Sequence, residues 1–85
     1  MAPNAPPKLV RRMFALLGQA GVTEDRDRYA LYRWMVADPR IGSTDNLDEH
    51  EIRTIADTLA YWQRNGELES RARTAIDEAR ARWGG

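Results

Sequence analysis

The stretch LDEHEIRTIADTLA, residues 47–60, decides the fold. Asp48 and Glu51 stand at the spacing of a capping box, in which each side chain accepts a hydrogen bond from the backbone N–H of the other residue. Leu47 and Ile52 occupy the two positions of a hydrophobic staple, which fixes the angle at which the chain enters a helix. The apolar residues that follow repeat at the spacing of one helix face: Ile52, Ile55, Ala56, Leu59 and Ala60. The pattern predicts an amphipathic helix that starts at Asp48.

Turn-forming residues divide the rest of the chain into further helices. Gly21 and Gly66 each follow an apolar helical pattern, and glycine is the usual residue in the left-handed turn that ends a helix. Thr23 is suited to cap a helix with its hydroxyl, and Pro39 disfavours a helical conformation in the residue before it. We therefore expect helices over residues 8–20, from Thr23 to Asp38, from Asp48 to Asn65, and over residues 67–83.

The spacing of apolar residues is helical throughout, and the sequence lacks the two-residue alternation that is typical of a strand. The predicted fold class is all-α: a small bundle of three helices plus a fourth, carboxy-terminal helix that packs on it or extends to a partner. A length of 85 residues favours a single helical domain, expected over residues 8–85. We expect residues 1–7 to form a disordered Pro-rich tail, since they carry three prolines and no apolar core. For the same reason we expect this segment to be neither a signal peptide nor a membrane anchor.

The composition argues against several classes of function. Lys and Arg number 13 and Asp and Glu number 13, so no net charge draws the molecule towards nucleic acid or an anionic membrane. The absence of cysteine rules out disulfides and thiolate metal sites and fits a cytoplasmic protein. His50 is the only histidine and lacks partners at metal-ligand spacing, and Gly42–Thr44 lacks the lysine of a phosphate loop. We expect no enzyme activity, no metal, no cofactor and no small-molecule substrate.

The second expected helix has apolar residues on nearly every side, which is typical of a helix buried at the centre of a bundle. An alternative is that one face packs on the core while Tyr32 or Trp34, together with Arg33, forms an exposed anchor for a partner. Tyrosine, tryptophan and arginine are the residue types that dominate the binding energy of protein interfaces. Both interpretations stay open at this point.

The fourth expected helix carries a narrow apolar stripe that needs a neighbour, and Leu68, Ile76 and Trp83 are its large members. The stripe either packs on the same chain or forms a seam with a second copy or with another protein. Arginines flank the stripe, but four-residue spacings predict that several of them are neutralised within the helix. The expected pairs are Glu67 with Arg71, Glu69 with Arg73, and Glu78 with Arg82.

A basic face on the first helix supports an alternative function. Lys8, Arg11 and Arg12 lie opposite its apolar residues, and this helix contains no acidic residue. The three cations, assisted by Arg28 or Arg33, would contact phosphates in a weak DNA-binding accessory protein. A helix-turn-helix is disfavoured, because the helix that starts at Asp48 would present acidic residues to DNA at the end that reads bases.

The order of the pieces resembles a known helical module. The pieces are Leu16-Leu17-Gly18, Gly21-Val22-Thr23-Glu24-Asp25, a tyrosine-bearing helix, a polar loop over Ser43–Asn46, and Leu47-Asp48-Glu49. Over Lys8–Trp62 the chain is similar to a module of bacteriophage proteins, including the carboxy-terminal part of the GemA-like regulatory family and modules of actinobacterial phage recombination proteins. The resemblance implies a phage-encoded accessory protein without catalytic activity, located in the cytoplasm of a bacterial host. We expect it to bind a host or phage protein, or a second copy of itself as a homodimer.

Overall fold

The computed structural model describes residues 5–84, and these residues form an all-helical fold without a β-strand. Four α-helices and one short 3-10 helix follow one another along the chain: α1 (Pro7–Gln19), α2 (Asp25–Val36), η1 (Thr44–Asn46), α3 (Glu49–Arg64) and α4 (Leu68–Trp83). Helix α1 begins inside the expected tail, and Ala5 packs against the core. Residues 1–4 of the expected tail lie outside the described residues.

Helix α3 starts as its sequence predicts. The Glu51 backbone N–H donates to Asp48 Oδ1 at 2.8 Å, and the Asp48 backbone N–H donates to Glu51 Oε1 at 2.9 Å. Leu47 and Ile52, the two staple residues, are both buried. The capping box is therefore confirmed, and it fixes the start of the apolar stripe of α3.

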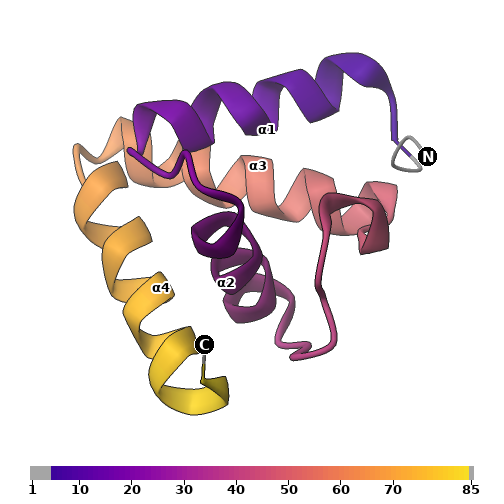
Figure 1. Ribbon diagram of the computed structural model, residues 1–85. Helices are drawn as coiled ribbons and strands as arrows, with labels where there is room; N and C mark the ends of the chain where they lie inside the picture. The colour runs from indigo at the N-terminus through magenta and orange to yellow at the C-terminus, as the bar shows by residue number, and fades with distance from the viewer. Residues whose placement is uncertain (1–4, 85) are drawn as a thin grey trace.

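The helices pack as two pairs that cross each other. Helix α1 packs mainly on α3, and α2 packs mainly on α4 (Figure 1). Helices α1 and α3 run in the same direction, because Arg12 contacts Asp57 near the middle of the pair and Gln19 contacts Gln63 at its end. The radius of gyration, 11.7 Å, is close to the value of about 12 Å expected for a compact domain of this length.

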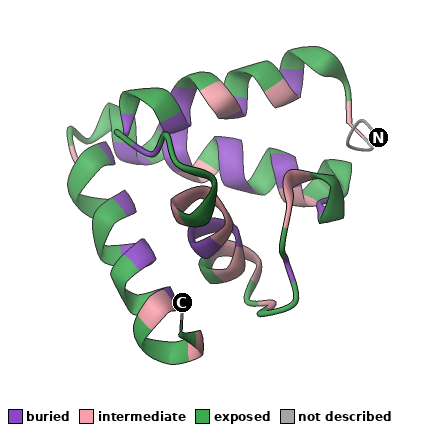
Figure 2. Cartoon of the chain, in the orientation of Figure 1, coloured by how far each residue is buried: buried purple, intermediate pink, exposed green. Residues whose placement is uncertain are grey.

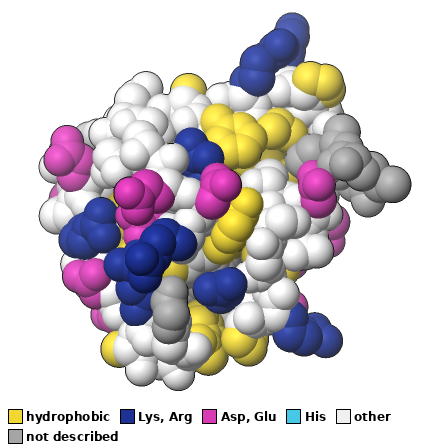
Figure 3. All heavy atoms as spheres, viewed as in Figure 1, with side chains coloured by type: hydrophobic (Ala, Val, Ile, Leu, Met, Phe, Trp, Pro, Cys, Tyr) yellow, Lys and Arg dark blue, Asp and Glu magenta, His cyan; other side chains and the backbone are white. Residues whose placement is uncertain are grey.

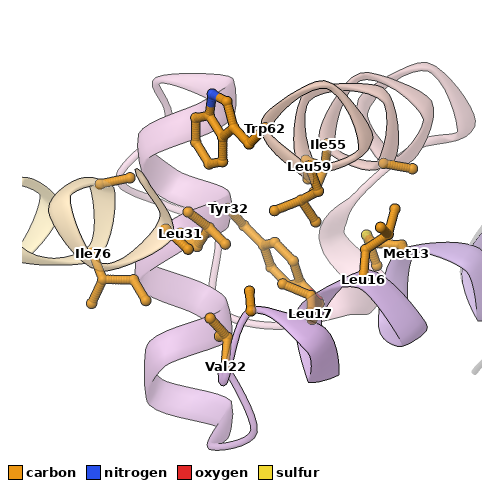
Figure 4. Packing of buried hydrophobic residues seen from close by; sticks show 14 of the residues in the cluster. Met13, Leu16, Leu17, Val22, Leu31, Tyr32, Ile55, Leu59, Trp62 and Ile76 are labelled. Atoms are coloured by element: carbon orange, nitrogen blue, oxygen red, sulfur yellow. The ribbon is translucent and has the colours of Figure 1, made fainter. Parts of the chain in front are cut away.

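The buried face of every helix points into one core (Figure 2). Helix α2 supplies its centre: Tyr32 points between Leu17 of α1 and Leu59 of α3, while Leu31 lies beside Ile76 of α4 (Figure 4). Helix α2 is thus buried along Ala30, Leu31 and Tyr32, as the first interpretation expects, while its Trp34 stays at the surface, as the alternative expects. A helix that contacts a neighbour on several sides needs apolar residues on several sides.

Both ends of α2 differ from the sequence prediction. Glu24, and not Thr23, is the residue before the first turn, and no side chain caps it. The helix ends at Val36, before the expected Asp38, because Ala37 adopts a left-handed conformation with φ of 54°. After this reversal, the Arg33 Nε–H donates to the Ile41 carbonyl oxygen of the following loop at 2.7 Å.

Candidate protein-binding surface

Two open depressions lie on the surface of the described residues. The larger depression, about 410 Å³, lies where α3 gives way to α4 and includes Gln63 and Ser70. The smaller, about 260 Å³, lies between Met35 and the start of α3, where it includes His50. No polar or charged residue in the described part is classed as buried, and that part contains no group of three or more His, Cys, Asp or Glu residues able to hold a metal ion. Both depressions are open to solvent and are lined by polar and apolar residues together.

Tyr32 is not an exposed anchor, and the sequence interpretation that placed it at the surface was wrong. Its side chain has no exposed surface, because the ring fills the space between α1 and α3. Its hydroxyl group lies 3.1 Å from the Thr44 hydroxyl oxygen in a hydrogen bond. Burial is the main cause that raises the Tyr32 pKa above 10.0, and the Thr44 hydrogen bond offsets this in part. Tyr32 therefore joins η1 to the core.

Arg33 also acts within the chain. Its side chain is half-buried, and its hydrogen bond to the Ile41 carbonyl oxygen holds the loop after α2. A guanidinium that donates to a buried loop carbonyl stabilises that loop. Arg33 therefore has a structural role in this loop. Of the three residues considered for the anchor, Tyr32, Arg33 and Trp34, Trp34 is the exposed one.

Trp34 lies at the surface and is held in place from two sides. The residue is 36% exposed. Its indole N–H donates to Glu78 Oε2 of α4 at 2.8 Å, and its ring centroid lies 6.1 Å from that of Trp62 of α3, with the two planes tilted by 55°. Trp62 itself is buried and points towards α2 (Figure 4). We call Trp34, Trp62 and Glu78 together the Trp34 surface.

The apolar stripe of α4 packs on its own chain. Leu68 is buried, Ile76 has no exposed surface, and Trp83 is half-buried against the core. Of the two alternatives, packing on the same chain is therefore the one observed, and Leu68 and Ile76 are not available for a seam with a second molecule, because the other helices already cover them. Trp83 stays at the edge of the core, with the Arg82 guanidinium carbon 5.5 Å from its ring centroid.

The ion pairs of the arginines that flank the α4 stripe agree with the sequence prediction only in part. Arg71 pairs with Glu67 at 2.7 Å, as its four-residue spacing predicts. The arginines on the other side of the stripe, Arg73 and Arg80, instead pair with Asp27 of α2. Arg80 forms an ion pair with Asp27 Oδ1, and Arg73 Nη2 lies 3.9 Å from Asp27 Oδ2. Asp27 is largely buried between the two helices, and its ion pairs tie α4 to α2. Neither pairing of Asp27 is visible from local spacing.

The residues of the expected basic face do not form one free basic surface in the structure. Lys8 and Arg11 are exposed on α1, while Arg12 pairs with Asp57 of α3 at 3.0 Å. Arg28 pairs with Asp25 at 3.0 Å, and its guanidinium carbon lies 5.2 Å from the Phe14 ring centroid. Basic and acidic side chains are interspersed on the face shown in Figure 3. Of the cations expected to contact phosphates, Arg12, Arg28 and Arg33 are therefore engaged within the chain.

The grouping of Trp34 with Trp62 and Glu78 was not predicted from the sequence. Trp62 stands next to the α3 stripe, and Glu78 was expected to pair with Arg82. The three residues come from three helices, so only the packing of α2 and α4 across the end of α3 brings them together. Tyr61, the other exposed large apolar residue in the described part, was also not singled out as a site.

Comparison of the chain with protein-family profiles, curated proteins and solved structures gives no match. Within the described residues, none of the helices has the length and apolar character required to cross a bilayer.

Proposed function

We propose that this chain is a non-enzymatic interaction domain that binds another protein through the Trp34 surface. The observation that carries the proposal is an exposed tryptophan held by a second tryptophan and by a carboxylate from a third helix. Tryptophan is among the residue types most enriched at the points that dominate interface energy. A large indole at the surface of a small domain gives a partner a broad apolar contact with few rotatable bonds.

Contacts within the chain hold the Trp34 surface in place. Trp34 is fixed by its hydrogen bond to Glu78, and the helix that carries Glu78 is fixed by Ile76 in the core and by the Arg80 ion pair with Asp27. Ordering a mobile aromatic side chain on binding costs about 0.5–1.5 kcal/mol. Because contacts within the fold already hold the Trp34 side chain, binding a partner orders it further at little cost in free energy. This favours a binding role for the surface.

Protein binding has stronger support than DNA binding. Lys8 and Arg11 are the exposed members of the basic face that make no ion pair on the described surface, and two phosphate contacts give weak, salt-sensitive affinity. The similarity of residues 8–62 to phage accessory modules stays a prediction, and so does a host or phage protein as the partner. Self-association stays a prediction too, with the Trp34 surface and Trp83 as its available contacts.

Affinity capture with matched variants tests the proposal. Trp34→Ala removes the exposed indole, and Tyr61→Ala removes another exposed aromatic side chain, near Arg64 and the end of α3, as the control. A partner that is retained by the wild-type chain and by Tyr61→Ala, but lost with folded Trp34→Ala, supports the proposal. Equal retention by all three chains, or loss with Tyr61→Ala alone, would refute the Trp34 surface as the binding site.

A further inference from the structure

The Trp34 surface combines an aromatic face with a carboxylate. The Trp34 indole N–H uses one oxygen of Glu78, the Oε2 atom, as its acceptor. An ionised carboxylate has about four acceptor positions on its two oxygens, so Glu78 keeps capacity for a further donor. The exposed part of the Trp34 ring and the remaining acceptor positions of Glu78 lie side by side at the surface, because the hydrogen bond joins the two groups.

The basic residues next to Glu78 on α4 face other groups. Arg82, one turn further along, lies over the Trp83 ring, with 5.5 Å between its guanidinium carbon and the ring centroid. Arg71, two turns earlier, is hydrogen-bonded to Glu67. Glu78 therefore brings a negative charge to the edge of an exposed indole, and this charge complements a cation from outside the chain.

We propose that the partner presents an arginine side chain to the Trp34 surface, an inference that rests on the proposed function. The guanidinium stacks on the exposed indole face of Trp34 and donates hydrogen bonds to the Glu78 carboxylate. Tryptophan has the most favourable ring for cation–π contact. Arginine fits better than lysine, because its planar group stacks and donates at the same time, whereas an ammonium is a strongly hydrated point charge.

Short blocked peptides test the charge requirement directly. The probes are acetyl-Gly-Arg-Gly-amide and the same peptide with citrulline, which keeps the shape of arginine but lacks its charge. Binding is followed by NMR through the indole N–H resonances of the full-length chain. We expect the arginine peptide to shift the Trp34 resonance saturably, and the citrulline peptide to bind about tenfold more weakly. Equal shifts with both peptides, or no saturable shift with either, would overturn the inference.

Two glutamate variants separate the role of Glu78 from general electrostatics. Glu78→Gln keeps an oxygen that can accept the Trp34 N–H but removes the charge, so the fold is retained and arginine affinity falls to the citrulline level. Glu69→Gln changes the net charge by the same amount at an exposed position near the start of α4, and is expected to leave arginine affinity unchanged. Equal losses in both variants, or no loss in Glu78→Gln, would contradict the inference.

The peptide and capture experiments fail in distinguishable ways. If a partner is lost with Trp34→Ala but the arginine and citrulline peptides bind alike, the Trp34 surface binds proteins without recognising arginine. If partner capture is unaffected by Trp34→Ala, the proposed function fails together with the inference. Loss of the same partner with Glu78→Gln, but not with Glu69→Gln, supports both.

Discussion

Replacing Ile76 with alanine tests whether α4 is part of the core. The change removes three carbon atoms from a side chain that has no exposed surface and lies beside Leu31. At about 0.8 kcal/mol for each buried methylene-sized group, the lost transfer free energy is about 2.4 kcal/mol. A residual cavity adds about 24 cal/mol for each Å³ that the surroundings fail to fill. We therefore expect the free energy of unfolding to fall by about 3–4 kcal/mol.

Urea unfolding followed by circular dichroism and by tryptophan fluorescence measures this loss. A chain of 85 residues has a free energy of unfolding of about 4–13 kcal/mol, so the variant is expected to lose a large share of its stability. The unfolding midpoint should fall by about 2–3 M with the slope of the transition unchanged. Thr74→Ala, an exposed position on α4, is the control and should change stability by less than about 0.5 kcal/mol. A loss below about 1 kcal/mol in Ile76→Ala would refute the packing of α4 into the core.

Three further changes test other contacts. Burial raises the Tyr32 pKa in the folded chain. The stability that the neutral Tyr32 hydroxyl contributes is therefore complete below about pH 10, the pKa in the unfolded chain, and is lost as the pH rises through the pKa in the folded chain. Alkaline titration should show one tyrosine that ionises late. Tyr32→Phe, which breaks the bond to Thr44, should cost about 1 kcal/mol in thermal unfolding and remove the late titration. Asp27→Asn should cost about 1–3 kcal/mol in urea unfolding, since Arg80 is left half-buried without its counter-charge; an unchanged midpoint would contradict this. Ala37→Gly should stabilise the chain by about 0.5–1 kcal/mol, because glycine adopts a φ of 54° without strain, and a lower melting temperature would contradict the left-handed end of α2.

Local chemistry predicted the helices well. The reciprocal bonds of Asp48 and Glu51 involve residues three apart, so the start of α3 could be deduced from a few letters of sequence. Gly21 and Gly66 both have a positive φ after a helix, as predicted. The end of α2 was missed because Ala37 ends the helix in a left-handed conformation, for which alanine gives no signal in the sequence.

The surface was predicted only in part, for a physical reason. Hydrophobic periodicity shows that α2 has too many apolar residues for one face, but it does not show which of them a neighbouring helix covers. Tyr32 and Trp34 were therefore equivalent in the sequence, whereas the crossing of the helix pairs buries the first and exposes the second. Asp27 of α2 likewise pairs with Arg80 of α4, a contact that no four-residue spacing predicts.

Native-state hydrogen exchange of α4 tests the central claim most directly, namely that one chain closes its own core and leaves the Trp34 surface outside. We predict that the Ala72 and Ile76 amides exchange only through global unfolding, with the same free energy as the Ile55 and Leu59 amides of α3. Exchange of the α4 amides at a free energy several kcal/mol lower than that of the α3 amides would contradict the claim.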